Sequence, residues 1–207
     1  GISNENKNIR DIRKRMGAII ETPSIYLDMT AEDNLKEQYR VIGMPSFAGI
    51  KELLEFVGLS HTGKKKAKNF SLGMKQRLGI AIALAGNPDF LVLDEPINGL
   101  DPEGIIEIRE LILKLNKQKG ITILISSHYL DELSKIATHY GFVDKGRIIK
   151  EISNAELEKN CKKRIEVNVN NIKECVKYLE EYNYSYEVIS DNIVNVYDKI
   201  NVSEFTI

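Results

Sequence analysis

Two short apolar segments, separated by one helical segment, constrain the fold of this chain more than any other feature. Phe90–Leu93 and Ile121–Ile125 are apolar on both faces, as strands inside a parallel sheet are. The segment Glu103–Lys119 lies between them and has the spacing of apolar residues expected for a helix. Alternating strands and helices of these lengths predict an α/β fold built on a parallel sheet.

Polar side chains follow both apolar segments directly. Asp94 and Glu95 come after the first, and Ser126-Ser127-His128 come after the second. In open α/β sheets, ligands bind at the edge where the carboxyl ends of the strands lie. An acidic pair at this edge can hold Mg²⁺ through Asp94 and polarise an attacking water through Glu95. The alternative is that Asp94-Glu95 is only a strand end and that His128 is structural.

A small turn containing glycine opens the apolar helix that precedes Phe90. This turn and the first residues of the helix read Phe70-Ser71-Leu72-Gly73-Met74-Lys75-Gln76-Arg77. The free N–H groups and the positive end of the helix dipole can be directed at a phosphate. A second turn, Asn98-Gly99-Leu100-Asp101-Pro102, follows the acidic pair. There Asp101 can cap the next helix, with Pro102 at its first position.

This order of a glycine-containing loop, an apolar helix and an acidic strand end resembles the ABC-type ATPase, with its signature loop and its Walker B strand. The resemblance covers about residues 1–153. It implies ATP and Mg²⁺ as cofactors, a switch histidine that contacts the γ-phosphate, and a D-loop that touches the nucleotide site of a partner subunit. The implied site residues are Glu95 and His128 for catalysis, Ser71, Gly73 and Asp101 for the nucleotide, and Asp94 for the metal.

An earlier segment, a short predicted strand that runs into a loop, resembles a particular branch of this family. Gly17-Ala18-Ile19-Ile20-Glu21-Thr22-Pro23-Ser24-Ile25-Tyr26 is similar to bacitracin/lantibiotic-type exporters, in which a separate ATPase subunit pairs with a membrane subunit. Most ABC ATPases carry Gln where this chain has Glu21, and a carboxylate there implies a second Mg²⁺ ligand. The alternative is a surface carboxylate beside a turn. The signature also departs from the consensus, with Leu72 and Met74 in place of Gly and Gln.

The loop Glu21–Asp28 is the expected contact with membrane-spanning transporter subunits. Its apolar residues form a stretch with no evident place in the local core, which is typical of an interaction surface. These apolar residues are Pro23, Ile25, Tyr26 and Leu27.

The family also requires a phosphate-binding P-loop, G-x-x-x-x-G-K-S/T, upstream of the signature, and this chain contains no such string. Thr62-Gly63-Lys64-Lys65-Lys66 lacks the paired glycines and follows no apolar strand, so it is interpreted as a solvated turn. Since the chain begins Gly1-Ile2-Ser3, we expect a fragment of a longer protein; the alternative is a naturally degenerate member. The chain alone is expected to bind and hydrolyse ATP poorly.

The composition is that of an ordinary soluble globular protein, with 43% hydrophobic and 29% charged residues among 207. A net charge of −1 gives no electrostatic reason to expect a nucleic-acid partner. The longest apolar stretch, around Leu78–Gly86, is far shorter than a membrane span. Cys161 and Cys175 lack metal-ligand spacing and are interpreted as free thiols.

The sequence therefore predicts an α/β, ABC-type (P-loop NTPase-like) parallel sheet that lacks the N-terminal P-loop portion. We expect a partial ABC ATPase domain over residues 1–153, with a helical signature subdomain at about 28–86, and a small α+β appendage. The appendage is an incomplete βαββ accessory segment over residues 161–207. A helix is also expected over Leu130–Thr138.

The resemblance implies an ATP-hydrolysing subunit that forms a homodimer or heterodimer and drives export of a peptide antibiotic or similar substrate. It would lie in the cytoplasm at the inner face of the cell membrane, with separate membrane subunits as partners. The alternative is a degenerate, non-hydrolysing ABC domain with a regulatory or structural role. A DNA-repair or chromosome-type ABC ATPase would need coiled-coil arms, and residues 1–70 contain no sustained heptads.

Overall fold

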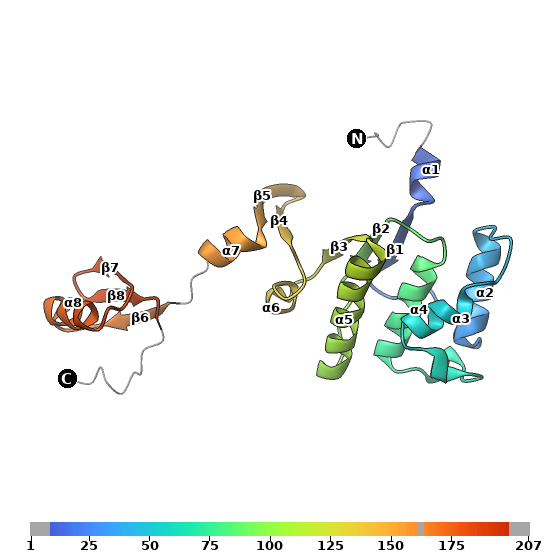
Figure 1. Cartoon of the computed structure of the whole chain (residues 1–207), viewed down its shortest axis with the longest axis horizontal. Coiled ribbons are helices and arrows are strands. Elements are labelled where there is room, and N and C mark those ends of the chain that lie inside the picture. The colour runs from blue at the N-terminus through green and yellow to red at the C-terminus, as the bar shows by residue number, and fades with distance from the viewer. Residues whose placement is uncertain (1–8, 161–163, 199–207) are drawn as a thin grey trace. The chain divides into compact units, whose positions relative to one another are not determined.

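The computed structural model describes residues 9–160 and 164–198, which fall into two compact units (Figure 1). The first unit is Gly1–Ile136 and the second is Ala137–Ile207. Parts of the predicted accessory segment, residues 161–163 and 199–207, lie outside the described residues, as do Cys161 and the first eight residues of the chain.

The first unit alternates helices with three strands. Its elements are α1 (Ile9–Arg13), β1 (Met16–Ile20), α2 (Ala31–Val41), α3 (Ile50–Phe56), the single-turn 3₁₀ helices η1 (Ser60–Thr62) and η2 (Ala67–Asn69), α4 (Leu72–Leu84), β2 (Phe90–Asp94), α5 (Pro102–Lys119), β3 (Thr122–Ser126) and α6 (Leu130–Leu133).

The strands β1, β2 and β3 form one parallel sheet with β2 in the centre. The predicted parallel sheet is therefore confirmed. The register pairs Ile20 with Asp94 and Asp94 with Ser126, so the carboxyl ends of all three strands lie level with one another. This register decides which side chains meet at the edge of the sheet.

The core of the first unit lies where α4 and α5 pack against the sheet (Figure 1). Gly17 makes the approach of β1 to α4 possible, because a Cβ atom there would lie 2.3 Å from the carbonyl oxygen of Ala83. Leu91 and Leu93 of β2 are fully buried in this core, as expected for a central strand. Along β1 and β3, alternate side chains such as Ile20 and Leu124 are exposed.

Helix boundaries follow local capping chemistry. Thr30 caps α2 by accepting a hydrogen bond from the N–H group of Asp33. Helix α5 begins with Pro102 at its first position and ends at Lys119, and the capping residue Gly120 follows with a φ of +66° that suits glycine.

The prediction of a helix over Leu130–Thr138 is wrong in its length, because α6 ends at Leu133. The Ser134 hydroxyl donates to the carbonyl of Asp131, and such local bonds compete with a regular helix. The chain then enters the next strand at His139.

The second unit contains a hairpin followed by a small sheet. Its elements are β4 (His139–Asp144), β5 (Arg147–Ser153), α7 (Asn154–Asn160), β6 (Ile165–Asn168), α8 (Ile172–Glu181), β7 (Tyr186–Ser190) and β8 (Ile193–Val196).

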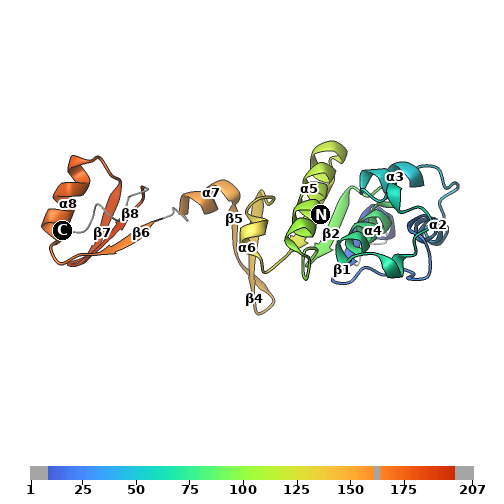
Figure 2. The same ribbon diagram turned by 90° about the horizontal axis from the view of Figure 1, so that it is seen from below.

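The last three strands form an antiparallel sheet in the order β6-β8-β7, with α8 alongside it (Figure 2). A separate small core joins the helix to the sheet through Leu179, Val194 and Val196. Cys175 belongs to this core as a free thiol, and burial raises the pKa of that thiol.

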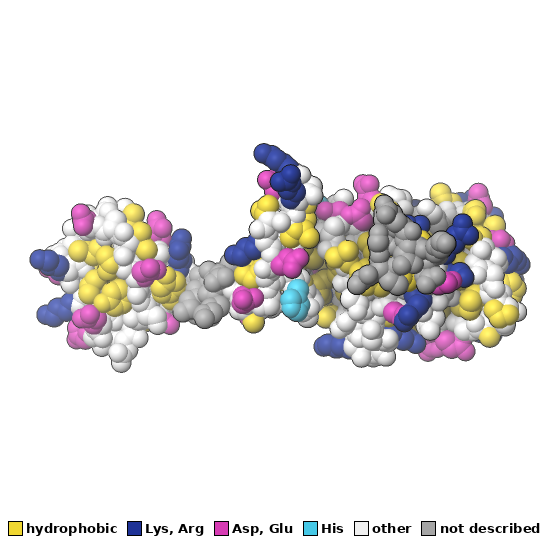
Figure 3. Space-filling model, turned by 90° about the horizontal axis from the view of Figure 1, so that it is seen from above, with side chains coloured by type: hydrophobic (Ala, Val, Ile, Leu, Met, Phe, Trp, Pro, Cys, Tyr) yellow, Lys and Arg dark blue, Asp and Glu magenta, His cyan; other side chains and the backbone are white. Residues whose placement is uncertain are grey.

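The surface carries no obvious segregation of charge on the face drawn in Figure 3. Lys and Arg side chains are interspersed there with Asp and Glu side chains on each unit. Among the residues that the structure describes, every helix is too short or too polar to cross a bilayer.

Candidate functional site

The polar residues predicted to follow the strands do meet at one edge of the parallel sheet. The N–H group of Glu21 donates to the carbonyl of Asp94 at 3.2 Å, which joins the end of β1 to the end of β2. The N–H group of Glu95 donates to the carbonyl of Ser126 at 3.1 Å, which joins β2 to β3. Four of the predicted site residues, Glu21, Asp94, Glu95 and His128, therefore belong to this edge.

Two of these acidic residues have an unusual backbone conformation. Glu21 has a φ of +53° and Glu95 a φ of +48°, both in the left-handed region that favours glycine. Such a conformation costs a non-glycine residue roughly 1–3 kcal/mol and tends to occur at functional sites. The chain thus turns sharply after β1 and after β2, and each turn is made by a glutamate although a glycine would adopt this conformation with less strain.

Glu95 and His128 form a direct contact at this edge. The Nδ1 atom of His128 lies 2.9 Å from Oε1 of Glu95. An ionised carboxylate can only accept a hydrogen bond, so Nδ1 carries the hydrogen. The Glu95 side chain is 25% exposed and that of His128 is 60% exposed. The second oxygen, Oε2 of Glu95, is buried and has no hydrogen-bond partner among the described residues.

Asp94 is held by a residue to which the sequence gave no role. The hydroxyl of Ser126 donates to Oδ1 of Asp94 and accepts a hydrogen bond from the N–H group of Glu95 at 3.2 Å. The only signal in the sequence was the position of Ser126 directly after a predicted strand. Its contact with Asp94 depends on the register of β3 against β2, which the sequence does not reveal.

The other three predicted site residues line a separate open hollow of about 450 Å³ between the signature loop and the turn before α5. Ser71 caps α4 by accepting a hydrogen bond from the N–H group of Met74 at 3.2 Å. Asp101 caps α5 by accepting from Gly104 at 3.1 Å, as predicted. The residues that line the hollow are Ser71, Leu72, Gly73, Met74, Arg77, Gly99, Leu100, Asp101, Glu103, Gly104 and Glu107.

The two residues that depart from the signature consensus, Leu72 and Met74, both line the hollow. The Leu72 side chain is 48% exposed and lies against Gly99, where an added Cβ atom would be 3.4 Å from it. Gly73 is buried where α4 approaches α5. The mostly buried Arg77 pairs with Glu107 at 3.3 Å and so joins the two helices at the side of the hollow. None of the sheet-edge residues lines this hollow.

The donor atoms at the sheet edge suit a magnesium ion that is shared with a nucleotide. Among the residues in 9–160 and 164–198, no three His, Cys, Asp or Glu side chains are close enough to hold a metal ion alone. Mg²⁺ usually takes only one or two carboxylates from a protein and completes its shell with water and substrate phosphates. The carboxylate of Asp94, fixed by Ser126, fits that requirement.

The loop Glu21–Asp28 is more deeply anchored than the sequence suggested. The prediction that its whole apolar stretch lacks a place in the core is wrong for Pro23, which packs against Gly79, and for Ile25, which contacts the main core. The remaining two side chains are exposed, Tyr26 by 59% and Leu27 by 48%.

Two polar residues from other elements, Asn34 and Lys68, anchor this loop. The buried side chain of Asn34 accepts from the N–H group of Tyr26 at 2.7 Å and donates to the carbonyl of Tyr26 at 3.0 Å. Lys68 pairs with Asp28 at 2.8 Å, and this lowers the pKa of the Asp28 carboxyl. The sequence gave no sign of either contact, because each joins residues from different elements.

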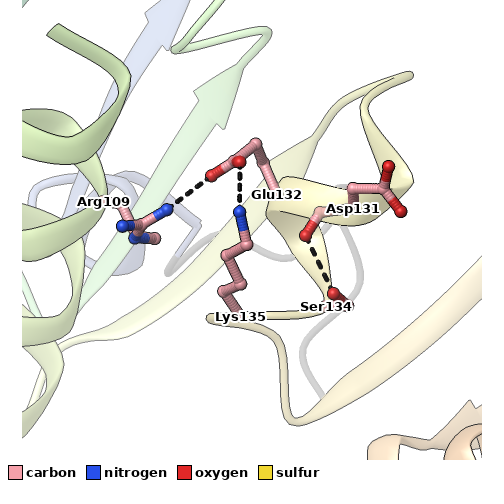
Figure 4. A network of polar contacts seen from close by, with 5 residues as sticks. All are labelled: Arg109, Asp131, Glu132, Ser134 and Lys135. Atoms are coloured by element: carbon pink, nitrogen blue, oxygen red, sulfur yellow. Dashed lines mark hydrogen bonds and ion pairs between the residues drawn. The ribbon is translucent and has the colours of Figure 1, made fainter. Parts of the chain in front are cut away.

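A group of charged residues ties α6, which follows His128, to α5 (Figure 4). Arg109 of α5 contacts Glu132 at 2.8 Å, and Lys135 contacts the other oxygen of the same carboxylate at 2.5 Å. The side chains of Arg109 and Glu132 are only 22% and 21% exposed. The hydrogen bond from Lys135, followed by that from Arg109, lowers the pKa of Glu132.

Comparison with known proteins agrees with this geometry. Residues 1–98 match the family described as ABC transporter. The bacitracin transport ATP-binding protein BcrA of Bacillus licheniformis is 43% identical over 196 residues, which are 94% of this chain and 64% of that protein. The lantibiotic transport ATP-binding protein SrtF of Streptococcus pyogenes is 51% identical over 142 residues, 69% of this chain and 61% of that protein.

Solved structures give the same result. CbiO1 of Clostridium perfringens, described as part of the ABC transporter complex CbiONQ, has a TM-score of 0.67 at 25% identity. That alignment covers 87% of this chain and 68% of CbiO1. The chain spans 64% of the length of BcrA. Residues 1–98 thus match the ABC transporter family, and the chain is similar in sequence to bacitracin and lantibiotic transport ATP-binding proteins.

Proposed function

We propose that the full-length protein, meaning the natural polypeptide that contains these 207 residues, hydrolyses ATP as a subunit of an export system. The observation that carries the proposal is the pairing of Glu95 with His128 at 2.9 Å, beside Asp94 at the carboxyl edge of a parallel sheet. A general base and its partner must lie within hydrogen-bond reach of each other, and these two do.

Each residue at this edge has a distinct proposed role. Glu95 accepts a proton from the attacking water, and its buried Oε2 has no competing partner among the described residues. Asp94 and Glu21 would hold Mg²⁺ through their carboxylate oxygens, and the ion would supply positive charge that stabilises the charge developing on the transferred phosphoryl group. His128 contacts the γ-phosphate. While Nδ1 of a neutral His128 donates to Glu95, its Nε2 can only accept, so this contact requires the imidazolium form or release of Nδ1.

The separation of the site residues into two groups supports a dimeric enzyme. Ser71, Gly73 and Asp101 line their own hollow and are not among the residues of the sheet edge. We propose that this hollow of one subunit closes over the nucleotide held by a second subunit, which completes the site. The second subunit is either another copy of the protein or a related chain.

The proposed partners are membrane-spanning subunits that contact the loop Glu21–Asp28, and the proposed cargo is a peptide antibiotic or a similar substrate. The first part is supported by the exposed Leu27 and by the exposed Tyr26, whose backbone is held by Asn34. The names of the bacitracin and lantibiotic transport relatives support the second. The subunit would then lie in the cytoplasm, at the inner face of the membrane.

A second candidate is a regulatory or structural ABC domain that does not hydrolyse ATP. A coding sequence upstream of Gly1 without a G-x-x-x-x-G-K-S/T string would favour it, because that string supplies the main cradle for the β- and γ-phosphates. The two candidates differ in what they require of Glu95, because only the first needs it as a base.

The variant Glu95→Gln of the full-length protein separates these candidates. Gln keeps the shape of Glu but cannot accept the proton, so phosphate release should fall to background while binding of a fluorescent ATP analogue persists. Glu110→Gln, an exposed change on α5, is the matched control and should keep wild-type turnover. A wild-type protein without turnover would support the regulatory candidate, and normal turnover in Glu95→Gln would remove Glu95 from its proposed role.

A further inference from the structure

We propose that Ser126 is a positioning residue whose hydroxyl holds both members of the acidic pair in their working geometry. This inference deepens the proposed function and rests on it. Ser126 ends β3 directly opposite Asp94, the last residue of β2. Its hydroxyl donates to Oδ1 of Asp94, and its oxygen accepts from the N–H group of Glu95 at 3.2 Å. One side chain thus contacts two adjacent residues of the proposed site.

The first contact orients the Asp94 carboxylate. A hydroxyl has one hydrogen to donate, and here that hydrogen is given to Oδ1. Oδ2 then remains free to face a cation or one of its water ligands. Partners of this kind, which touch a metal ligand and not the metal, usually decide how well the ligand is oriented.

The second contact supports the strained turn at Glu95. Glu95 has a φ of +48°, and its N–H group donates to Ser126 through both the carbonyl at 3.1 Å and the hydroxyl at 3.2 Å. A non-glycine residue keeps such a conformation only where surrounding contacts impose it. Ser126 supplies two of these contacts, and the turn they support places the Glu95 carboxylate beside His128.

The test uses three variants of the full-length protein. Ser126→Ala removes the hydroxyl, while Ser126→Thr keeps it on a residue that strands accept well. Thr122→Val is the matched control, because it removes a hydroxyl from the same face of the same strand, four residues before Ser126. Wild type and variants are compared in kcat, in KM for ATP, in the Mg²⁺ concentration for half-maximal turnover and in thermal stability.

We expect Ser126→Ala to lower kcat about tenfold and to raise the Mg²⁺ requirement, with KM for ATP nearly unchanged. Ser126→Thr should restore both values, and Thr122→Val should match the wild type. Equal kcat and Mg²⁺ dependence in Ser126→Ala and Thr122→Val would overturn the proposal. So would a loss in Ser126→Ala that follows a lowered melting temperature and is not restored by Thr.

A second measurement needs no nucleotide and no turnover. Hydrogen–deuterium exchange of the amide of Glu95 should be faster in Ser126→Ala than in the wild type or Thr122→Val, because one of its two acceptors is gone. Unchanged exchange would overturn the role of Ser126. A wild-type protein that shows this protection but no Mg²⁺-dependent ATPase would instead contradict the proposed function.

Discussion

At the scale of single residues, Glu21 and Glu95 share a left-handed backbone conformation that the sequence did not predict. Each follows a parallel strand, and each turns the chain through the left-handed region. The apolar strand before Glu95 was enough to predict that its carboxylate lies at the edge of the sheet, whereas the role of Glu21 was expected from the family resemblance. The turn itself, and the hydroxyl of Ser126 that supports Glu95, depend on how β3 lies against β2. Such contacts between strands are absent from any local sequence pattern.

Glu21 offers a direct test of the metal role at this scale. In the full-length protein, Glu21→Gln should raise the Mg²⁺ concentration needed for half-maximal hydrolysis, because Mg²⁺ favours anionic oxygen ligands. Glu21→Ala should lower turnover further, since it removes the oxygen altogether. Glu55→Gln, an exposed carboxylate on α3, is the control. The same Mg²⁺ dependence in all three variants would make Glu21 an ordinary surface carboxylate.

At the scale of elements, helix caps could be predicted from the sequence, whereas contacts between residues of different elements could not. Asp101 caps α5 as its sequence position predicted. The shortness of α6 was missed, because its apolar residues continue a helical pattern that Ser134 and the approach to β4 interrupt. The anchoring of the loop Glu21–Asp28 by Asn34 was also missed, because no spacing rule relates a buried amide to a loop eight residues away.

The charged group between α5 and α6 predicts a dependence of stability on pH. The folded protein lowers the pKa of Glu132 below its ordinary value of 4.5. The folded state therefore binds fewer protons than the unfolded state, so this contribution is fully present above pH 4.5 and is lost as the pH falls through the lowered pKa.

Glu132→Gln should reduce the free energy of unfolding at pH 7 by about 1 kcal/mol, a modest value because the group is partly exposed. The difference from the wild type should shrink as the pH is lowered below 4.5 in urea unfolding measurements. Asp131→Asn is the control, since Asp131 points away from Arg109 and Lys135 in Figure 4. A constant difference at every pH would show that the ion pair does not stabilise the fold.

The loop Glu21–Asp28 predicts a separation of transport from hydrolysis. Tyr26→Asp places a charge on a side chain that is 59% exposed, so the fold and the ATPase rate of the isolated subunit should not change. Export in cells that contain the membrane subunits should fall, because a charge in an apolar contact is costly. Normal export by Tyr26→Asp would remove this loop from the proposed interface.

At the scale of the whole molecule, the alternation of strands and helices was enough to predict the fold class, while the family was expected from the resemblance of the signature loop and the acidic strand end. The division of the chain into compact units was harder to predict from the sequence. The two compact units divide between Ile136 and Ala137, whereas the sequence placed the hairpin of β4 and β5 with the ATPase domain. That assignment rests on a resemblance in sequence and stays a prediction. Tertiary contacts, which local patterns do not contain, decide where a compact unit ends.

The missing phosphate cradle predicts a property of the chain as a whole. These 207 residues alone should bind a fluorescent ATP analogue weakly and release no phosphate, because no P-loop string is present. A polypeptide that adds a P-loop-bearing segment before Gly1 should do both. Ordinary turnover by the 207 residues alone would mean that another part of the chain holds the phosphates.

The central claim is that the hollow around Leu72 in one subunit closes over a nucleotide held at the sheet edge of another. In the full-length protein, ATP should trap Glu95→Gln as a dimer in size-exclusion chromatography. Adding Leu72→Glu should abolish that dimer, because it places a negative charge where a phosphate would lie and leaves the Ser71 cap intact. Adding Ile106→Glu, an exposed change outside the hollow, should not. A dimer that persists in Glu95→Gln with Leu72→Glu would contradict the account.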